Sequence, residues 1–225
     1  MESPCLPVAP LVGQPDWVRA GINRLMLPVQ SRVRESQRWF SRWRDTYAER
    51  MLKRHRHELS PASQVPRWPG RRARWLDQQS HASRLAAADA VIEIGCGLST
   101  RFQRLGGASQ LWFCLDSPLI YRCWACFFAE SSQLRYIPAQ DPCDHWLAYL
   151  ARRCQRPLII MENRGCPVTS DCLARWEKPL HRYFPQADWL LAEAMAAGRQ
   201  SKPTVNPDFV PGGAGLRMHL LGLRD

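Results

Sequence analysis

The sequence predicts an α/β protein with an open parallel sheet, helices on both faces of the sheet and a helical addition at the N-terminus. Three observations support this prediction. An apolar run over residues 90–94 leads directly into the glycine-containing turn Gly95-Cys96-Gly97. Asp116 follows Gly95 by 21 positions and ends a second apolar run. Beyond residue 90, short apolar runs alternate with helical stretches, which is the pattern of βαβ units.

Length and composition limit the number of domains and the class of protein. The chain has 225 residues, of which 45% are hydrophobic, enough for the core of one α/β domain. No stretch approaches the ~20 apolar residues that a transmembrane helix needs. The first 14 residues lack the basic start and apolar run of a signal peptide. We therefore expect a cytoplasmic protein without a membrane span.

The cysteines fit the same expectation. There are nine, an odd number, and they fall in apolar segments or expected helices, which favours reduced thiols. Cys123 and Cys126 form a Cys-x-x-Cys, but no second Cys or His pair stands at zinc spacing. Helix packing is the simpler interpretation of this pair, and we expect no metal site.

Positive charge is concentrated in the N-terminal part. The formal net charge is +11, and residues 1–89 account for +8 of it. Such a segment could meet nucleic acid, an acidic lipid surface or an anionic substrate. A solvated basic helix face is the simpler interpretation, and nucleic acid is a possible partner that the sequence does not favour.

Residues 1–70 are expected to form a helical extension and linker, and residues 71–225 the main domain. A first short helix begins at Asp16 and ends at Pro28. A second is predicted over residues 31–57, because large apolar side chains recur there every four positions. These side chains are Trp39, Trp43, Tyr47 and Met51.

The main domain is expected to begin with a helix over residues 71–86. Strands are predicted over 90–94, 110–115, 134–138, 158–162 and 189–193, with a final strand within 215–223. Helices are predicted over 100–105, from Pro118 onward, over 144–154 and from Thr169 or Ser170 to His181. Proline suits the first turn of a helix, and a strand that is apolar on both faces suits the interior of a parallel sheet.

Four carboxylates fall at or just beyond the carboxyl ends of the predicted strands, namely Glu93, Asp116, Asp141 and Glu162. Ligands of open parallel sheets bind at that edge, where an acid after the second strand binds ribose hydroxyls. A dinucleotide site would carry a third glycine at the position of Thr100. This difference and Glu93 favour S-adenosylmethionine (SAM) over NAD. Asp141 is also a common turn starter because it precedes proline, and a tight turn without a ligand would need the same glycines.

Residues 91–124 resemble the SAM-binding core of the leucine carboxyl methyltransferase family, which includes the tetracenomycin-type polyketide O-methyltransferases. The residues that match are Gly95-Cys96-Gly97-Leu98-Ser99-Thr100-Arg101-Phe102 and Asp116-Ser117-Pro118. Segments 139–146 and 157–162 are similar to later parts of the family pattern. The resemblance implies a Rossmann-like class I methyltransferase sheet, with SAM as cofactor.

The same resemblance implies a set of cofactor-binding residues. They are Arg72, Glu93, Gly95, Gly97, Asp116, Asp141 and Glu162. Arg72 would correspond to the family's arginine that grips the SAM carboxylate, with Arg71 and Arg74 as rival positions.

The substrate half departs from the family pattern. Pro167 stands where the family has tyrosine, and Ser99 replaces an acid in the glycine turn. Only 32 residues follow Glu193, so the usual lid must be reduced. The resemblance therefore implies a cofactor but no particular acceptor.

The expected reaction is O-methyl transfer to a carboxylate or hydroxyl of a small molecule, or to a terminal carboxyl. A carboxylate acceptor needs no general base, and Arg101, Arg164 or the basic N-terminal helix could hold it. Arg101 fits a structural salt bridge equally well. A hydroxyl acceptor would need a base such as His145 or His181. The alternatives are a non-catalytic interaction module on the same fold and a nucleic-acid methyltransferase that uses the basic N-terminal helix.

Overall fold

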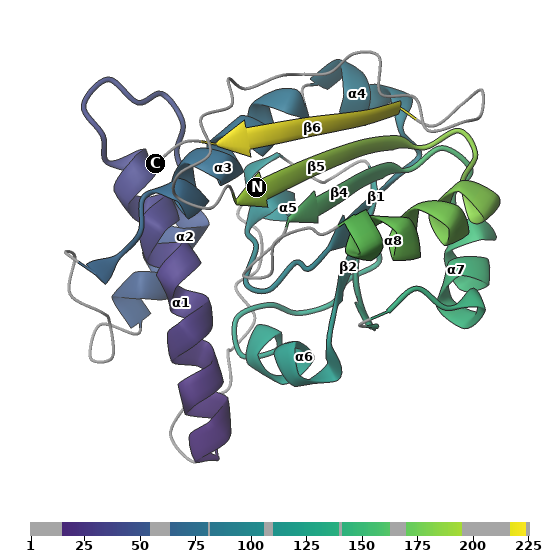
Figure 1. Ribbon diagram of the computed structural model, residues 1–225. Coiled ribbons are helices and arrows are strands. Elements are labelled where there is room, and N and C mark those ends of the chain that lie inside the picture. The colour runs from purple at the N-terminus through teal and green to yellow at the C-terminus, as the bar shows by residue number, and fades with distance from the viewer. Residues whose placement is uncertain are drawn as a thin grey trace.

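The structure, a computed structural model, describes residues 15–54, 64–80, 82–105, 110–139, 141–162, 170–194 and 217–223. A sheet of parallel strands in the order β3-β2-β1-β4-β5-β6 forms its centre (Figure 1). The strands are β1 (Ala90–Ile94), β2 (Leu111–Asp116), β3 (Leu134–Pro138), β4 (Leu158–Glu162), β5 (Asp188–Ala194) and β6 (Arg217–Leu223). The order 3-2-1-4-5 is Rossmann-like, and it confirms the predicted parallel α/β fold.

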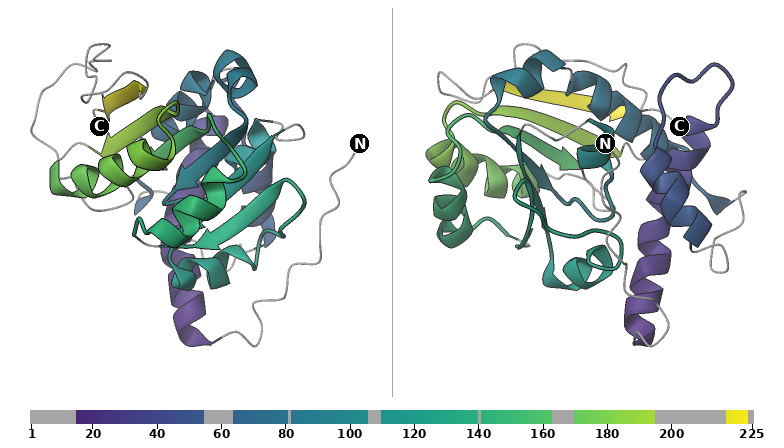
Figure 2. Two further views of the ribbon diagram at one scale, coloured as in Figure 1. Left: turned by 90° about the vertical axis from the view of Figure 1, so that its right-hand side faces the viewer. Right: turned by 180° about the vertical axis from the view of Figure 1, so that it is seen from behind.

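Helices cover both faces of this sheet. Figure 2 shows α7 and α8 on one side and α1 and α3 on the other. The helices are α1 (Asp16–Ser36), α2 (Thr46–Arg54), α3 (Trp68–Gln79), α4 (Ala82–Ala87), α5 (Arg101–Arg104), α6 (Pro118–Trp124), α7 (Asp144–Ala151) and α8 (Ser170–Tyr183). None of the helices within the described ranges is long and apolar enough to cross a membrane.

Side-chain alternation along the strands separates two cores. Ile92 and Ile94 of β1 pack with α7 and α8, whereas Val91 belongs to the core beneath α1 and α3. Val18 and Met26 of α1 are buried in that second core, so the N-terminal helix packs on the same apolar surface as the strands. All five positions of β1 are buried, as expected for a strand covered on both faces.

The first helix is longer than its sequence indicates. The prediction that Pro28 ends it is wrong, because α1 continues through Pro28 to Ser36. Proline removes one backbone hydrogen bond from a helix. Burial of Met26, Val29 and Val33 against the core favours continuation of the helix and outweighs that loss.

The predicted continuous helix over residues 31–57 is also wrong. α1 and α2 are separate, and Phe40 between them has a φ of 67°, which no α-helix accommodates. Asp45 accepts a hydrogen bond from the backbone N–H of Ala48 at 3.0 Å and so caps α2. Trp39 is 85% exposed, so it does not share the core packing of Tyr47 and Met51.

The predicted helix over residues 71–86 is two helices in the structure. The backbone N–H of Ser80 donates to the carbonyl of Leu76 at 2.8 Å and closes the last turn of α3. The remaining elements lie close to their predicted positions. Pro118 opens α6, as predicted, and the side chain of Ser117 caps it by accepting from the N–H of Ile120.

Candidate functional site

The turn after β1 is built on two glycines in the left-handed region. Gly95 has a φ of 70° and Gly97 a φ of 47°. A Cβ on Gly95 would lie 2.9 Å from the carbonyl oxygen of Glu162, so only glycine fits there. The backbone N–H groups of Gly95 and Cys96 donate to the carbonyl of Leu115 at 2.8 and 3.2 Å. The turn is thus held between the carboxyl ends of β2 and β4.

Asp116 ends β2 beside this turn, and its carboxylate is fixed by two backbone donors. Gly97 N–H donates to Oδ2 at 2.9 Å, and Ser117 N–H donates to Oδ1 at 2.8 Å. The residue is half-buried. An oriented carboxylate with further accepting capacity can bind a pair of ligand hydroxyls. The strand order reverses between β1 and β4, and ligands of such sheets bind at that point.

A buried arginine network lies on the α1–α3 side of the same sheet edge. We use this name for Arg32, Arg72, Arg101 and Arg104 together with Asp45, Asp77, Glu93 and Glu162. Seven of the eight residues are buried. The eighth, Arg104, has a side chain that is only 5% exposed. Four guanidinium groups face four carboxylates, so their formal charges cancel.

Arg101 is the centre of this network. Its guanidinium is completely buried and forms ion pairs with Glu93, Glu162 and Asp77, the last at 3.0 Å. Burial by itself lowers the pKa of Arg101, but the charges of Glu93, Glu162 and Asp77 outweigh it and raise the pKa. Of the two roles considered for Arg101, an acceptor clamp and a structural salt bridge, the structure shows the salt bridge.

Strand geometry explains why the two glutamates meet. Glu93 pairs in register with Ile160 of β4, two residues before Glu162, and successive side chains alternate between the faces of the sheet. Glu93 and Glu162 therefore point to the same face. The indole N–H of Trp112 also donates to Glu93 at 3.3 Å, and Nη2 of Arg72 lies 3.4 Å from Oε2 of Glu162.

The outer half of the network joins the N-terminal helices to α5. Arg104 contacts Asp45 at 2.7 Å and Asp77 at 2.6 Å, and Arg32 contacts Asp45 at 2.9 Å. The Thr100 hydroxyl donates to Asp45 at 2.6 Å. Burial raises the pKa of Asp45, but Arg104, Arg32 and this hydrogen bond outweigh it and hold the pKa below its usual value.

Asp141 and His145 lie elsewhere, on a groove of about 1010 Å³ between α7 and the β2–β3 part of the sheet. Phe113 and Ile137 line it from the sheet, on the face opposite the buried arginine network. Asp141 is exposed and forms an ion pair with Arg175 at 2.8 Å. Pro118 is also part of the lining, so the groove reaches the sheet edge near Asp116.

The structure thus divides the predicted site residues into three groups. Gly95, Gly97 and Asp116 share the turn after β1. Arg72, Glu93 and Glu162 meet in the buried arginine network, together with the candidate Arg101. Asp141 and His145 line the groove, and Arg164 lies outside the described residues.

Of Arg71, Arg72 and Arg74, Arg72 contacts the glutamate at the end of β4. Among the described contacts, Arg74 pairs instead with Glu35 at 3.0 Å, and Arg71 lines a separate cleft next to α1. His181, the second candidate base, lies on α8 and is half-buried.

Sequence reasoning missed Arg32, Asp45 and Arg104. One signal was present for Arg104, because it stands three positions after Arg101 and two such residues share a helix face. Asp45 carried no usable signal, since it falls in the stretch that was predicted as the interior of one helix. Asp77 stands five positions after Arg72 in the sequence, but its contacts with Arg101 and Arg104 come from the fold.

The described cysteine side chains are unpaired thiols, namely Cys96, Cys114, Cys123, Cys126, Cys143 and Cys154. Burial raises the pKa of Cys123 to about 11, and its Sγ lies 3.8 Å from the carbonyl of Val18 in α1. Cys126 is buried as well, so this pair contributes to helix packing. Within the described ranges, no three His, Cys, Asp or Glu side chains are grouped to hold a metal ion.

Comparison of the chain with models of protein families and with curated proteins finds no match. The interpretation of the site therefore depends on its own geometry.

Proposed function

We propose that this protein binds SAM and transfers a methyl group to an oxygen acceptor. The acceptor would be a carboxylate or hydroxyl of a small molecule, or a terminal carboxyl. One observation carries the proposal. The Asp116 carboxylate is oriented by the N–H of Gly97, at the sheet edge next to the point where the strand order reverses.

The residues at this edge fit the ribose of a nucleoside. Asp116 presents carboxylate oxygens that already accept one backbone N–H each and retain lone pairs for two hydroxyls. Gly97 has no side chain to obstruct close approach of a ligand to the turn. A carboxylate here discriminates against a 2′-phosphate, which it would repel.

The buried arginine network fits the amino-acid end of SAM. The Arg72–Glu162 contact is the longest ion pair of the network, at 3.4 Å. A zwitterion that separates these two side chains gives Arg72 a carboxylate and Glu162 an ammonium, so every charge stays balanced. Buried charges that lose a partner are strongly destabilised. A mimic without the carboxylate would not replace the Glu162 charge beside Arg72, and one without the ammonium would leave Glu162 paired with Arg101 but not with Arg72, which predicts selectivity for the zwitterion.

SAM, when bound, supplies an electrophilic methyl group. The protein must then hold the acceptor oxygen in line with it and exclude water. A carboxylate acceptor with a pKa near ~4 is ionised at neutral pH and needs no base. For a hydroxyl acceptor, His145 is the candidate base on the groove beside Asp141.

The direct test is isothermal titration of the protein with S-adenosylhomocysteine at moderate salt, with adenosine and NAD as comparison ligands. We expect micromolar affinity for S-adenosylhomocysteine and weaker binding of both comparison ligands. Transfer of labelled methyl groups to a panel of carboxylate and phenolic acceptors would then identify the substrate class.

One observation favours a second candidate, a non-catalytic interaction module. Glu93 and Glu162 are charge-compensated by Arg101 and Arg72 within the protein itself. A folded protein that binds neither S-adenosylhomocysteine nor adenosine would reject the methyltransferase proposal and leave this candidate.

A further inference from the structure

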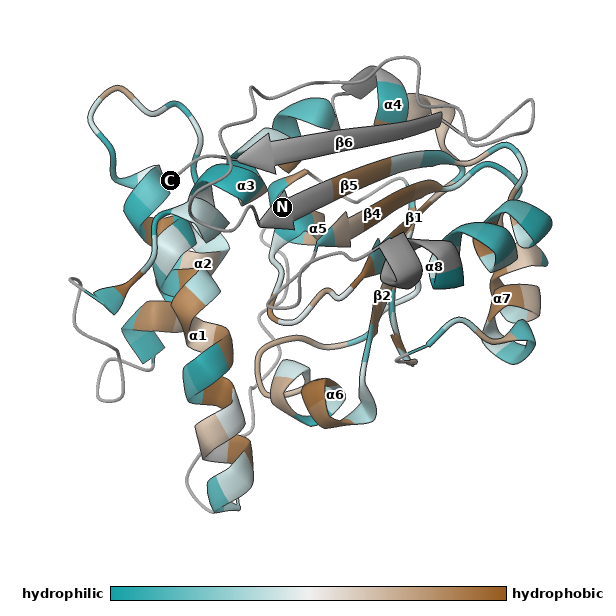
Figure 3. Cartoon of the chain, viewed as in Figure 1, coloured by the Kyte–Doolittle hydropathy of each residue, from teal (hydrophilic) through white to brown (hydrophobic). Residues whose placement is uncertain are grey.

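The connection between α1 and α2 displays two adjacent aromatic side chains to solvent. We call residues 37–45 the aromatic loop. It projects from the end of α1 (Figure 1). A short hydrophobic segment lies between hydrophilic segments of this loop (Figure 3). Trp39 is 85% exposed and Phe40 is 92% exposed, whereas no other large hydrophobic side chain of the described residues exceeds 57%. This is the most prominent apolar feature of the described surface.

The backbone of the loop is strained at Phe40. Phe40 has a φ of 67°, and it is the only non-glycine residue with a positive φ among those described. Left-handed backbone is disfavoured for bulky residues and persists at functional positions when the surroundings impose it. Because Phe40 buries almost nothing, the chain gains no packing in return. An external surface that covers the ring would supply the missing burial.

Contacts on both sides of the aromatic pair hold the loop in place. The N–H of Ser41 donates to the carbonyl of Arg38 at 2.9 Å. The indole N–H of Trp43 donates to Asp77 at 2.7 Å, and Arg44 donates to the carbonyl of Ser36. Hydrogen bonds thus attach the loop to the end of α1 and to α3, on both sides of the aromatic pair.

Arginines flank the aromatic pair in the sequence. Residues 37–44 include Arg38, Arg42 and Arg44, and they include no acidic residue. Arg38 also lines a cleft of about 140 Å³ between α1 and the start of α3. The cleft is lined by Ser31, Arg34, Glu35, Arg38, Arg67 and Arg71. Four arginines and one glutamate give it a formal charge of +3.

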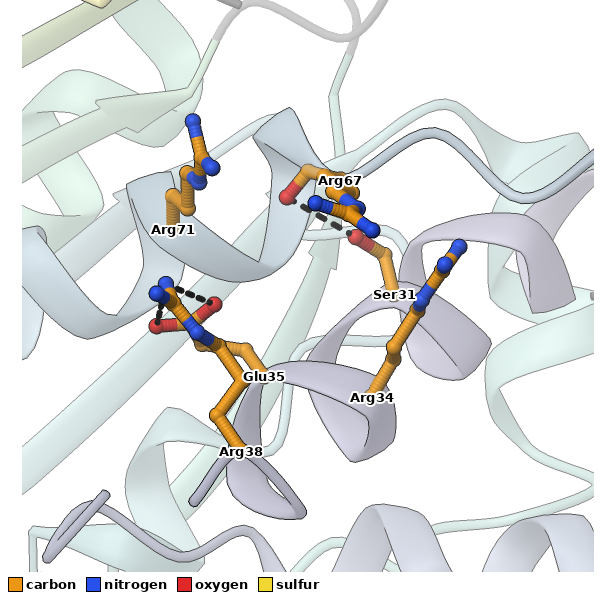
Figure 4. A pocket seen from close by; sticks show the side chains of 6 residues that line it. All are labelled: Ser31, Arg34, Glu35, Arg38, Arg67 and Arg71. Atoms are coloured by element: carbon orange, nitrogen blue, oxygen red, sulfur yellow. Dashed lines mark hydrogen bonds and ion pairs between the residues drawn. The ribbon is translucent and has the colours of Figure 1, made fainter. Parts of the chain in front are cut away.

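The single acid of this cleft does not face all of its arginines. Glu35 is ion-paired with Arg38 at 3.3 Å and with Arg74 at 3.0 Å. Figure 4 shows the Glu35 carboxylate facing Arg38, while the guanidinium groups of Arg34 and Arg71 point away from it. Ser31 accepts from the N–H of Gly70 at 2.9 Å, which holds α3 against α1. The cleft is therefore a basic surface that shares Arg38 with the aromatic loop.

We propose that this surface binds an anionic phospholipid membrane. Trp39 and Phe40 enter the interfacial layer, and the arginine-lined cleft binds a headgroup phosphate. Trp is favoured at membrane interfaces, and interfacial segments combine aromatic side chains with basic ones. Guanidinium groups pair with phosphate through charge-assisted hydrogen bonds. The proposal does not depend on the cofactor site, which lies at the sheet edge.

Membrane contact fits the two rings better than nucleic acid does. The ring planes of Trp39 and Phe40 are at 87° with centroids 5.8 Å apart, so the edge of one ring meets the face of the other. Successive bases stack on open aromatic faces, which a perpendicular pair in contact does not provide in series. A compact wedge of two rings on a projecting loop suits insertion between lipid headgroups.

The test is co-sedimentation of the full chain with two kinds of vesicle. One contains phosphatidylcholine and phosphatidylserine in equal amounts, and the other contains phosphatidylcholine alone. We expect association with the mixed vesicles, weaker association with the neutral ones, and a decrease in binding as salt is added.

Variants assign the binding to the proposed residues. Replacing both aromatic residues, Trp39→Ala with Phe40→Ala, should lower partitioning at least about tenfold, because two rings are no longer buried. Arg67→Gln and Arg71→Gln should each lower it about fivefold. Trp17→Ala is the matched control, since Trp17 is 42% exposed near the other end of α1 and should not contribute.

Three results would overturn the proposal, provided thermal melting shows a folded protein. They are failure to bind the mixed vesicles, binding that the double aromatic variant leaves unchanged, and equal loss of binding in Trp17→Ala. Binding of a single-stranded RNA oligonucleotide without vesicle binding would assign the surface to nucleic acid instead.

Discussion

The backbone N–H of Gly97 donates a hydrogen bond of 2.9 Å to the carboxylate of Asp116. This bond joins the turn after β1 to the end of β2, so the glycine turn and the acid form one unit. A carboxylate that is already oriented loses little conformational freedom on binding.

Substitution of Asp116 tests its role in cofactor binding. Asp116→Asn should weaken S-adenosylhomocysteine binding at least about tenfold, because hydrogen bonds to a charged group contribute more than neutral ones. Titration calorimetry measures the change. Asp89→Asn is a matched control, since Asp89 also accepts two backbone N–H groups but stands before β1, at the other edge of the sheet. Equal effects of both substitutions would reject the assignment.

Removal of Arg101 should destabilise the protein strongly. Arg101→Met leaves Glu93 and Glu162 buried without their main partner, and breaking a buried ion pair costs about 3–5 kcal/mol. Arg175→Met breaks an ion pair whose side chains are 65% and 61% exposed, which should cost less than about 1 kcal/mol. Urea unfolding compares the two. Similar small losses would mean that the network is more hydrated than its burial indicates.

Asp45 should make the free energy of unfolding depend on pH in the acid range. Its pKa is lowered in the folded protein, so its contribution is complete above the unfolded pKa of ~3.9 and is lost as pH falls through the folded value. Asp45→Asn should therefore be less stable than the parent at neutral pH. The difference in unfolding free energy should shrink below pH ~4. A difference that stays constant with pH would show that the Asp45 charge is not responsible.

Phe40→Gly should raise the free energy of unfolding. Glycine adopts a positive φ without the penalty of about 1–2 kcal/mol that other residues carry, and Phe40 buries too little to offset its removal. Trp39→Gly is the control, because Trp39 is as exposed but has no positive φ, and it should not stabilise the protein. Thermal melting distinguishes the two. If Phe40→Gly is destabilising, the ring has packing contacts that its exposure conceals.

The exposed arginines near the end of α1 and in α2 should not affect cofactor binding. Charge reversal of Arg38, Arg42 and Arg50 to glutamate should leave S-adenosylhomocysteine affinity unchanged, because these exposed side chains lie outside the site at the sheet edge. Calorimetry of the triple variant measures this. A loss of affinity would show that the region between α1 and α2 covers the cofactor site.

Local sequence was sufficient for most of the strands. β3 and β4 have the predicted bounds, and β2 and β5 differ from them by about one residue. Short apolar runs bounded by turn residues are typical of strands, and a run that is apolar on both faces is typical of the interior of a parallel sheet. The N-terminal helices were harder to predict, because the stripe from Trp39 to Met51 has helical spacing although Trp39 lies outside the core.

The sequence by itself determined the parallel α/β fold and the set of acids at the strand ends, because both follow from short apolar runs and the residues that end them. Only the tertiary structure decided how those acids are used. Arg101 is 61 positions from Glu162 and Arg72 is 90 positions from it, yet both reach its carboxylate. Burial then requires that each charge be matched, and sequence spacing cannot show whether an internal arginine or a ligand provides the match.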